Sequence, residues 1–558
     1  MQRMESISGL MVPPPPPPPA TEMPLPPPPP RFDSTIVLDS DDEEEFVRRN
    51  PFGKEKSMAT ASIPPPPPFP EESLPGPQPR VELMEFPEEV LASLEEGYQG
   101  PSKPGLLSAV AKRVMLNLQR ESHAKSSWIV GCIFLERDPG FSRVRAVLTE
   151  RLLAMPRFRA TMIVKEDKAF FRELAPDLIN IDYHIRQVVS NRAMSREEVE
   201  GYLGTLFDGS DTPNAEKRPL WNVRYIPKMD DGRACLITSV SHAIGDMISQ
   251  AELLRLLLDQ APQAEPFGIV KEPKRLGRVT RNRYWMRGVK NGLLGKTGEA
   301  DPFNTLRQRD RPGASPIKRV RFTENISLDR VHEIREKMPG VTVDDILVTV
   351  LTLMFKAYFV ESRDRAVLGG ARVRMTFPVS LRTHGEHELL DNGSHNAWAR
   401  GTLPLFLHHT GSSVSLLWKI KKRYERAKTA PSLLMEPRVT QTLSSLLSSK
   451  SLNRHILRTA AKSTIQMCGV TGPSQDAHLA GATVDDVHFL QFSPASLVVG
   501  LVSSNNKARA SISVAADLGV RPEAIATHWT SAFDQLHEEI MGVPRDSIRP
   551  PRGCFGCF

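Results

Sequence analysis

The chain has 558 residues, of which 40% are apolar, and it carries a formal net charge of +7. This length and apolar content are enough to bury one large core or two smaller ones, as in an ordinary globular protein. No uninterrupted apolar stretch approaches the roughly 20 residues that span a bilayer, and no apolar secretory segment follows the N-terminus. We therefore expect an intracellular protein without a transmembrane helix.

The first 88 residues differ from the rest of the chain, because the first 80 alone hold 23 of its 49 prolines. Such a composition cannot bury a core. We expect residues 1–88 to form a disordered, proline-rich and acidic arm whose polyproline II segments present a stiff surface to aromatic grooves of partner proteins. Within the arm, Thr35–Leu38 followed by the acidic run Asp39–Glu45 resembles a SUMO-interacting motif, which would add a strand to a partner's sheet edge.

Residues 89–266 alternate helical and strand-like patterns, which predicts an α/β or α+β domain. Trp128–Leu135 and residues 233–240 are rich in apolar and β-branched residues and predict strands. Residues 247–260 repeat apolar side chains at helical spacing and predict a helix. His242 therefore lies where a strand gives way to a helix.

Residues 267–320 form a basic crossover linker. Between 271 and 321 there are fifteen Lys or Arg against four acidic residues. Residues 281–290 interleave cations with Tyr284 and Trp285, a mixture suited to anionic lipid headgroups or to nucleic acid, although a solvated loop is the plainer interpretation. No nucleic-acid-binding pattern appears in the chain, so we favour a membrane surface and expect no nucleic acid partner.

Residues 321–540 return to a mixed pattern and predict a second domain, with a helix over 343–360 and strands over 372–378, 497–503 and 510–516. The tail, residues 541–558, places Cys554 and Cys557 beside arginines and phenylalanines. Two acyl chains together with basic charge anchor a protein stably, so dual S-acylation is a hypothesis for this tail. The lone C-x-x-C lacks a second cysteine pair, and we expect no metal site.

The spacing of His242 and Asp246 is the main chemical signal. Imidazole has an unperturbed pKa of about 6.5 and can take and return a proton near neutral pH, so His242 at a strand end is a candidate general base. Asp246 would begin the following helix, where the macrodipole favours a carboxylate. A histidine that only satisfies local hydrogen bonds is the alternative.

Several segments resemble the bifunctional wax ester synthase/diacylglycerol acyltransferase family, in the order in which that family carries them. The segment 241–247, Ser-His-Ala-Ile-Gly-Asp-Met, falls where the family has HHxxxDG. The other matching segments are Met155–Arg159, Ile181–Arg186, Arg218–Val223, Thr342–Ile346, Phe377–Arg382 and Gly469–Pro473. The resemblance covers about residues 105 to 540. It implies two chloramphenicol-acetyltransferase-like acyltransferase domains with a tunnel between them.

The resemblance also implies roles for individual residues. It assigns His242 as the catalytic base with Asp246 in support, and it suggests Pro219, Leu220, Trp221, Asp345 and Arg382 as substrate-binding residues. A core position is an equally good interpretation of Trp221. Three motif positions depart from the family, because Ser241 replaces its first histidine, Met247 its final glycine and Asp344 the asparagine of its Asn-Asp pair.

The activity implied is transfer of a fatty acyl group from acyl-CoA to diacylglycerol or a long-chain alcohol, which forms triacylglycerol or wax ester. No cofactor is implied beyond acyl-CoA as a substrate. The expected location is a peripheral membrane site on the endoplasmic reticulum, the plasma membrane or a lipid droplet. The alternative is a catalytically inactive acyltransferase fold that binds lipid and recruits partners through its arm.

Overall fold

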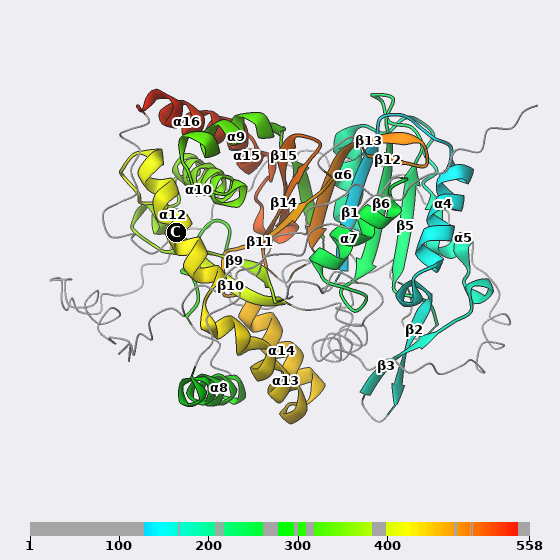
Figure 1. Ribbon diagram of the computed structural model, residues 1–558, viewed down its shortest axis with the longest axis horizontal. Coiled ribbons are helices and arrows are strands. Elements are labelled where there is room, and N and C mark those ends of the chain that lie inside the picture. Colours follow the sequence, from blue (N-terminus) through cyan, green and yellow to red (C-terminus); the bar gives the residue numbers. More distant parts are fainter. Residues whose placement is uncertain are drawn as a thin grey trace, which may run out of the picture. The chain divides into compact units, whose positions relative to one another are not determined.

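Two mixed β-sheets with helices around them organise the chain (Figure 1). The computed structural model describes residues 128–165, 168–206, 213, 217–259, 277–294, 299–307, 317–381, 398–473, 477–491, 493 and 495–544. The predicted arm, Arg382, Cys554 and Cys557 lie outside these residues. The described residues belong to one compact unit, Pro77–Phe558.

The first sheet has six strands in the order β12-β13-β1-β6-β5-β4. Its central strands β1 and β5 are buried at every position and β6 at all but one, as expected where both faces of a sheet are covered. The strands are β1 (Trp128–Leu135), β4 (Ile185–Gln187), β5 (Trp221–Ile226), β6 (Ala234–Ser241), β12 (His478–Leu479) and β13 (Ala482–Gln491). The helices of this part are α4 (Phe141–Leu153), α5 (Ile181–His184), α6 (Arg196–Thr205) and α7 (Met247–Leu257), and a separate ribbon pairs β2 (Ala160–Lys165) with β3 (Lys168–Glu173).

The second sheet follows the order β10-β9-β11-β14-β15-β7, and β8 pairs with β15 beside it. Its strands are β7 (Lys318–Phe322), β8 (Ile326–Ser327), β9 (Val373–Ser380), β10 (Trp398–Leu405), β11 (Ile465–Thr471), β14 (Leu497–Ser504) and β15 (Lys507–Ala515). The helices are α9 (Leu328–Lys337), α10 (Val343–Glu361), α11 (Arg365–Leu368), α12 (Ser413–Lys428), α13 (Glu436–Leu446), α14 (Ser449–Ala460), α15 (Glu523–Ala526) and α16 (His528–Gly542). Each sheet has its own apolar core.

The mixed α/β class is confirmed, and so are the main predicted elements. The strand predicted over 128–135 is β1, that over 233–240 is β6, and the helix over 343–360 is α10. The predicted helix over 247–260 is α7, which ends at Leu257. The basic linker contains a helix that the sequence analysis did not predict, α8 (Arg278–Leu293), which packs on α13 (Figure 1).

One strand passes from the second half of the chain into the first sheet. β13 pairs with β1 in an antiparallel ladder from Ile129–Gln491 to Leu135–Val484. β13 also packs against β14 of the second sheet, where a Cβ atom at Gly500 would collide with the carbonyl oxygen of Phe489. The domain boundaries at residues 266 and 320 stay predictions, but this crossing means that the first sheet is built from both halves.

Among the described residues, no helix combines the length and the apolar character needed to cross a bilayer.

Candidate active site

His242 leaves the first sheet at the end of β6. The preceding residue, Ser241, is held on both sides, because it pairs with Trp128 of β1 and its N–H donates to the carbonyl oxygen of Leu220 at 3.0 Å. The chain then turns, and the N–H of Ile244 donates to the Ser241 carbonyl oxygen at 2.9 Å. This turn leaves the His242 side chain half-buried, whereas its neighbours on either side are buried.

Asp246 is the N-cap of α7. Its Oδ1 accepts hydrogen bonds from the backbone N–H of Ser249 at 3.0 Å and from the Ser249 hydroxyl at 3.1 Å. The side chain is only 3% exposed. Because the first of these bonds satisfies a helix N–H group that has no partner within the helix, Asp246 fixes where α7 begins and how the turn bearing His242 is shaped.

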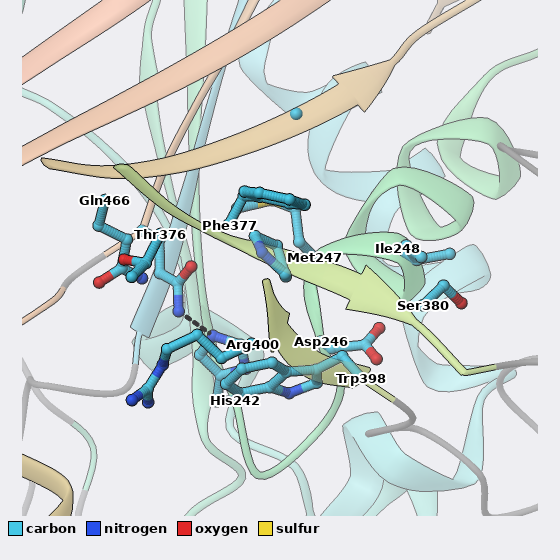
Figure 2. Close-up of a pocket in the computed structure, with 13 residues that line it drawn as sticks. His242, Asp246, Met247, Ile248, Thr376, Phe377, Ser380, Trp398, Arg400 and Gln466 are labelled. Atoms are coloured by element: carbon cyan, nitrogen blue, oxygen red, sulfur yellow. Dashed lines mark hydrogen bonds between the residues drawn. The ribbon is translucent and has the colours of Figure 1, made fainter. Parts of the chain in front are cut away.

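A side chain from the crossing strand meets His242. The amide nitrogen of Gln491, the last residue of β13, lies 2.8 Å from Nε2 of His242 (Figure 2). The two residues are 249 positions apart in the sequence. The candidate base and its described partner at Nε2 therefore come from opposite halves of the chain.

His242 opens into a cavity of about 90 Å³ that both halves line (Figure 2). The first half contributes the turn and the start of α7, and the second half contributes strands β9, β10, β11 and β13. The lining residues are His242, Asp246, Met247, Ile248, Thr376, Phe377, Pro378, Ser380, Trp398, Arg400, Gln466, Gly469 and Gln491. The mixture of apolar walls with a few polar groups is typical of a small-molecule site.

A wider cavity of about 360 Å³ adjoins the first, since both are lined by Ile248, Phe377, Pro378, Ser380 and Gly469. Its remaining wall carries charged side chains, among them Asp344, Lys421, Glu425 and Lys428. Asp344 is exposed to solvent in this wall, yet the atoms packed around its carboxylate raise its pKa, an effect that the positive charge of Lys428 opposes. The histidine cavity thus borders a larger and more polar space.

Pro219, Leu220 and Trp221 do not reach either cavity. All three are buried, and Trp221 donates its indole N–H to the carbonyl oxygen of Phe158 at 2.7 Å while stacking on His184. Their backbone supports the site indirectly, since Trp221 pairs with Val240 one residue before Ser241. Of the two interpretations of Trp221, the geometry favours the core.

Asp345 is also buried and acts as a cap rather than a lining residue. Its Oδ2 accepts from the N–H of Thr342 at 3.0 Å, and the Thr342 hydroxyl accepts from the N–H of Asp345 at 3.2 Å, which completes a capping box at the start of α10. Arg382, the remaining predicted substrate residue, lies outside the described residues.

The departures from the family motif have different structural consequences. Ser241 is fully buried and its hydroxyl accepts from the N–H of Ala243 at 3.1 Å, so this position supports the turn and does not line either cavity. Met247 does line the cavity beside His242, where a glycine would leave more room. Asp344 lines the wider cavity.

Gln491, Trp398 and Arg400 line the cavity from the second half but were not predicted from sequence. No local pattern marks a single glutamine, tryptophan or arginine in a strand as a site residue, and only the long-range pairing of β13 with β1 brings Gln491 to His242. In the part of the chain that the structure describes, no group of three or more His, Cys, Asp or Glu side chains could hold a metal ion.

Exchange of Asp246 tests its role as a cap. We expect Asp246→Ala to lower the free energy of unfolding by about 0.5–2 kcal/mol, because the N-terminal N–H groups of α7 lose their acceptor. Asp246→Asn keeps an acceptor oxygen and should lose much less. Urea unfolding of the two variants provides the comparison, and equal losses would mean that the negative charge matters rather than the cap.

Two sequence models of a single family match the chain. The wax ester synthase/diacylglycerol acyltransferase catalytic domain matches residues 130–347, and the C-terminal domain of the same family matches residues 396–537. A probable diacylglycerol O-acyltransferase of Mycobacterium tuberculosis is 27% identical over 230 residues, which are 37% of this chain and 48% of the relative. The chain thus matches about half the length of this relative.

Solved structures show the same fold. The wax ester synthase/diacylglycerol acyltransferase from Marinobacter aquaeolei matches with a TM-score of 0.53 and 15% identity, over 80% of this chain and 100% of that one. A trichothecene 15-O-acetyltransferase from Fusarium sporotrichioides matches with a TM-score of 0.50 and 12% identity, over 77% and 94% of the two chains. The expected acyltransferase fold is confirmed, and with both domain models covering more than half of its residues, the chain belongs to the wax ester synthase/diacylglycerol acyltransferase family.

Proposed function

We propose that the protein is an acyl-CoA-dependent O-acyltransferase that transfers a fatty acyl group to diacylglycerol or to a long-chain alcohol. The observation that carries this proposal is the half-buried ring of His242, whose Nε2 faces Gln491 in a cavity lined from both halves. Family membership supports the same reaction. The products would be triacylglycerol or wax ester, together with free CoA.

In the proposed reaction, Nε2 of His242 removes the proton from the acceptor hydroxyl as its oxygen attacks the thioester carbonyl. The resulting tetrahedral intermediate expels the CoA thiolate, which takes up the proton from the imidazolium. Such a base contributes about 10²- to 10⁴-fold to the rate, and orientation of the substrates and stabilisation of the oxyanion supply the rest. Asp246, bonded to Ser249, serves the reaction by holding the turn.

The two cavities would hold different parts of the substrates. The space beside His242 is small and suits the reacting hydroxyl and thioester. The wider cavity has room for a longer portion of the donor, and Lys421 and Lys428 on its wall would attract the phosphates of acyl-CoA. No other cofactor enters the reaction.

We propose further that α8 binds an anionic membrane surface. Val279, Met286 and Leu293 recur every seven residues, so they form one stripe along the helix, and all three are exposed. Arg283, Arg287 and Lys290 are exposed on the same side. An exposed apolar stripe beside cations suits acyl chains below anionic headgroups.

The opposite side of α8 is attached to the protein. Val289 packs with Leu443 and Leu452, Gly288 closely approaches Val439, and the indole N–H of Trp285 donates to the Thr442 hydroxyl at 3.2 Å. The helix is therefore anchored on α13 and α14 while its apolar stripe remains available. A peripheral site on the endoplasmic reticulum, plasma membrane or lipid droplet, acylation of Cys554 and Cys557, and partners of the arm stay predictions.

An ester-forming assay tests the proposed activity. The purified protein would be supplied with long-chain acyl-CoA and either diacylglycerol or hexadecanol, beside His242→Ala as the control. Loss of the base should lower kcat by about 10²- to 10⁴-fold. If neither the wild-type protein nor the variant forms ester with several donors and acceptors, the proposed activity is wrong and the lipid-binding scaffold takes its place.

Exchange of Met247 tests its effect on the acceptor. Met247→Ala removes three heavy atoms and would enlarge the cavity beside His242, so kcat/KM for the bulkier diacylglycerol should rise relative to hexadecanol by at least about tenfold, the effect of a single methylene group in a pocket. Met229→Ala, a buried methionine of the same half that lines neither cavity, is the matched control. The same acceptor ratio in all three proteins would show that Met247 does not limit the acceptor.

Vesicle sedimentation tests the membrane surface of α8. A triple exchange of Arg283, Arg287 and Lys290 for serine should weaken binding to phosphatidylserine-containing vesicles by roughly 100-fold at low salt, since each cation contributes about 1 kcal/mol. The matched control exchanges three exposed cations of α12, Lys422, Arg423 and Arg426, and should bind like the wild type. Equal losses in the two triple variants would indicate a general charge effect.

A further inference from the structure

The contact between Gln491 and His242 has a defined hydrogen-bond direction. The amide nitrogen of glutamine can only donate, so Nε2 of His242 must accept this bond across its 2.8 Å. A neutral imidazole that accepts at Nε2 carries its proton on Nδ1. Gln491 therefore favours the tautomer in which the Nε2 lone pair points into the cavity.

Two other charged residues, Asp246 and Arg400, line this cavity, and the hydrogen bonds described for them go to residues other than His242. Asp246 lines the cavity, but its Oδ1 accepts two bonds from Ser249. Arg400 enters from β10, and its backbone N–H donates to Glu436 at 2.6 Å. Among the lining residues, Gln491 is the group whose hydrogen bond to Nε2 the structure describes directly.

We propose that Gln491 is a positioning residue that prepares His242 for proton abstraction, an inference that rests on the proposed acyl transfer. In the free enzyme its amide N–H occupies the Nε2 lone pair and holds the ring in the Nδ1–H tautomer. The acceptor hydroxyl then replaces the amide as the donor to the same lone pair and transfers its proton there. When the imidazolium has passed this proton to the CoA thiolate, the amide returns to Nε2.

The pairing register of β13 on β1 fixes where Gln491 lies relative to His242. Gln491 pairs with Ile129, and the neighbouring pair on β1, Trp128 with Ser241, fixes the residue before His242. Gln491 thus lies at the end of β13 and His242 directly after the end of β6, and these two strands flank β1 on either side. A three-strand ladder sets the distance between base and amide, so no loop has to close to bring them together.

Exchange of the amide for a carboxylate tests the proposal. In Gln491→Glu the side chain keeps its size but becomes an acceptor with a negative charge, so Nε2 must carry a proton to bond it. The imidazolium is then stabilised, and the acidic limb of the kcat/KM profile should move to higher pH by about 1–3 units. For an ordinary histidine pKa near 6.5, activity at pH 7 should fall by about 3- to 200-fold over this range of shifts and return as the pH rises.

Two other variants distinguish the effect of the Gln491–His242 hydrogen bond from the effect of a negative charge anywhere in the cavity. Gln466→Glu adds the same charge to the same cavity, but Gln466 is bonded to Ser493 and not to His242, so its acidic limb should move by less than half as much. Gln491→Leu removes the donor to the neutral ring without adding charge, so kcat should fall by about two- to tenfold and the limb should move upward much less than in Gln491→Glu. The proposal is overturned if the limb of Gln491→Glu stays in place or moves no further than that of Gln466→Glu.

A measurement that does not require enzymatic activity tests this inference independently of the proposed function. Histidine NMR titration of the wild type and Gln491→Glu, with His242→Ala to identify the resonance, should show the same upward shift of the His242 pKa in the carboxylate variant. If no protein makes ester, the proposed activity fails while the titration still decides whether Gln491 acts on Nε2. An unmoved His242 resonance rejects the inference whatever the activity.

Discussion

The antiparallel ladder between β1 and β13 is the interaction on which the rest of the structure depends. It inserts a strand from near residue 490 into a sheet whose other main strands lie before residue 242, and it runs from Ile129 to Leu135. Because β13 also packs on β14, the ladder joins the two sheets. The small residue Gly500 is required where β14 approaches Phe489, since any side chain there would meet a backbone carbonyl.

A buried carboxylate also links the first half of the chain to the second sheet. Glu200 on α6 accepts a hydrogen bond from the backbone N–H of Phe322 at 2.9 Å and from Arg321 at 3.1 Å, so a carboxylate of the first half is bonded to a strand of the second sheet. Burial raises the pKa of Glu200 to about 7, even though both this backbone bond and Arg321 favour the charged form. These two hydrogen bonds tie α6 to β7.

The features that sequence alone predicted are local ones. The strand before His242, the helix after it and the cap at Asp246 follow from apolar periodicity and from the preference of carboxylates for helix N-termini. The location of Trp221 could not be assigned from sequence, because the apolar strand around it is compatible with either a core position or a tunnel wall. The helix α8 was missed since its cations obscure the apolar repeat. The role of Gln491 could not be predicted from sequence, because its position depends on pairing between segments about 360 residues apart.

The crossing strand also determines when the first sheet can be completed during synthesis. β1 leaves the ribosome early, yet one of its edges has no partner until residues 482–491 have been made. An apolar strand with an unpaired edge is a site for wrong pairing and aggregation. The first sheet must therefore wait for this late segment, and until it is made the nascent chain carries an open strand edge that chaperones would be expected to protect.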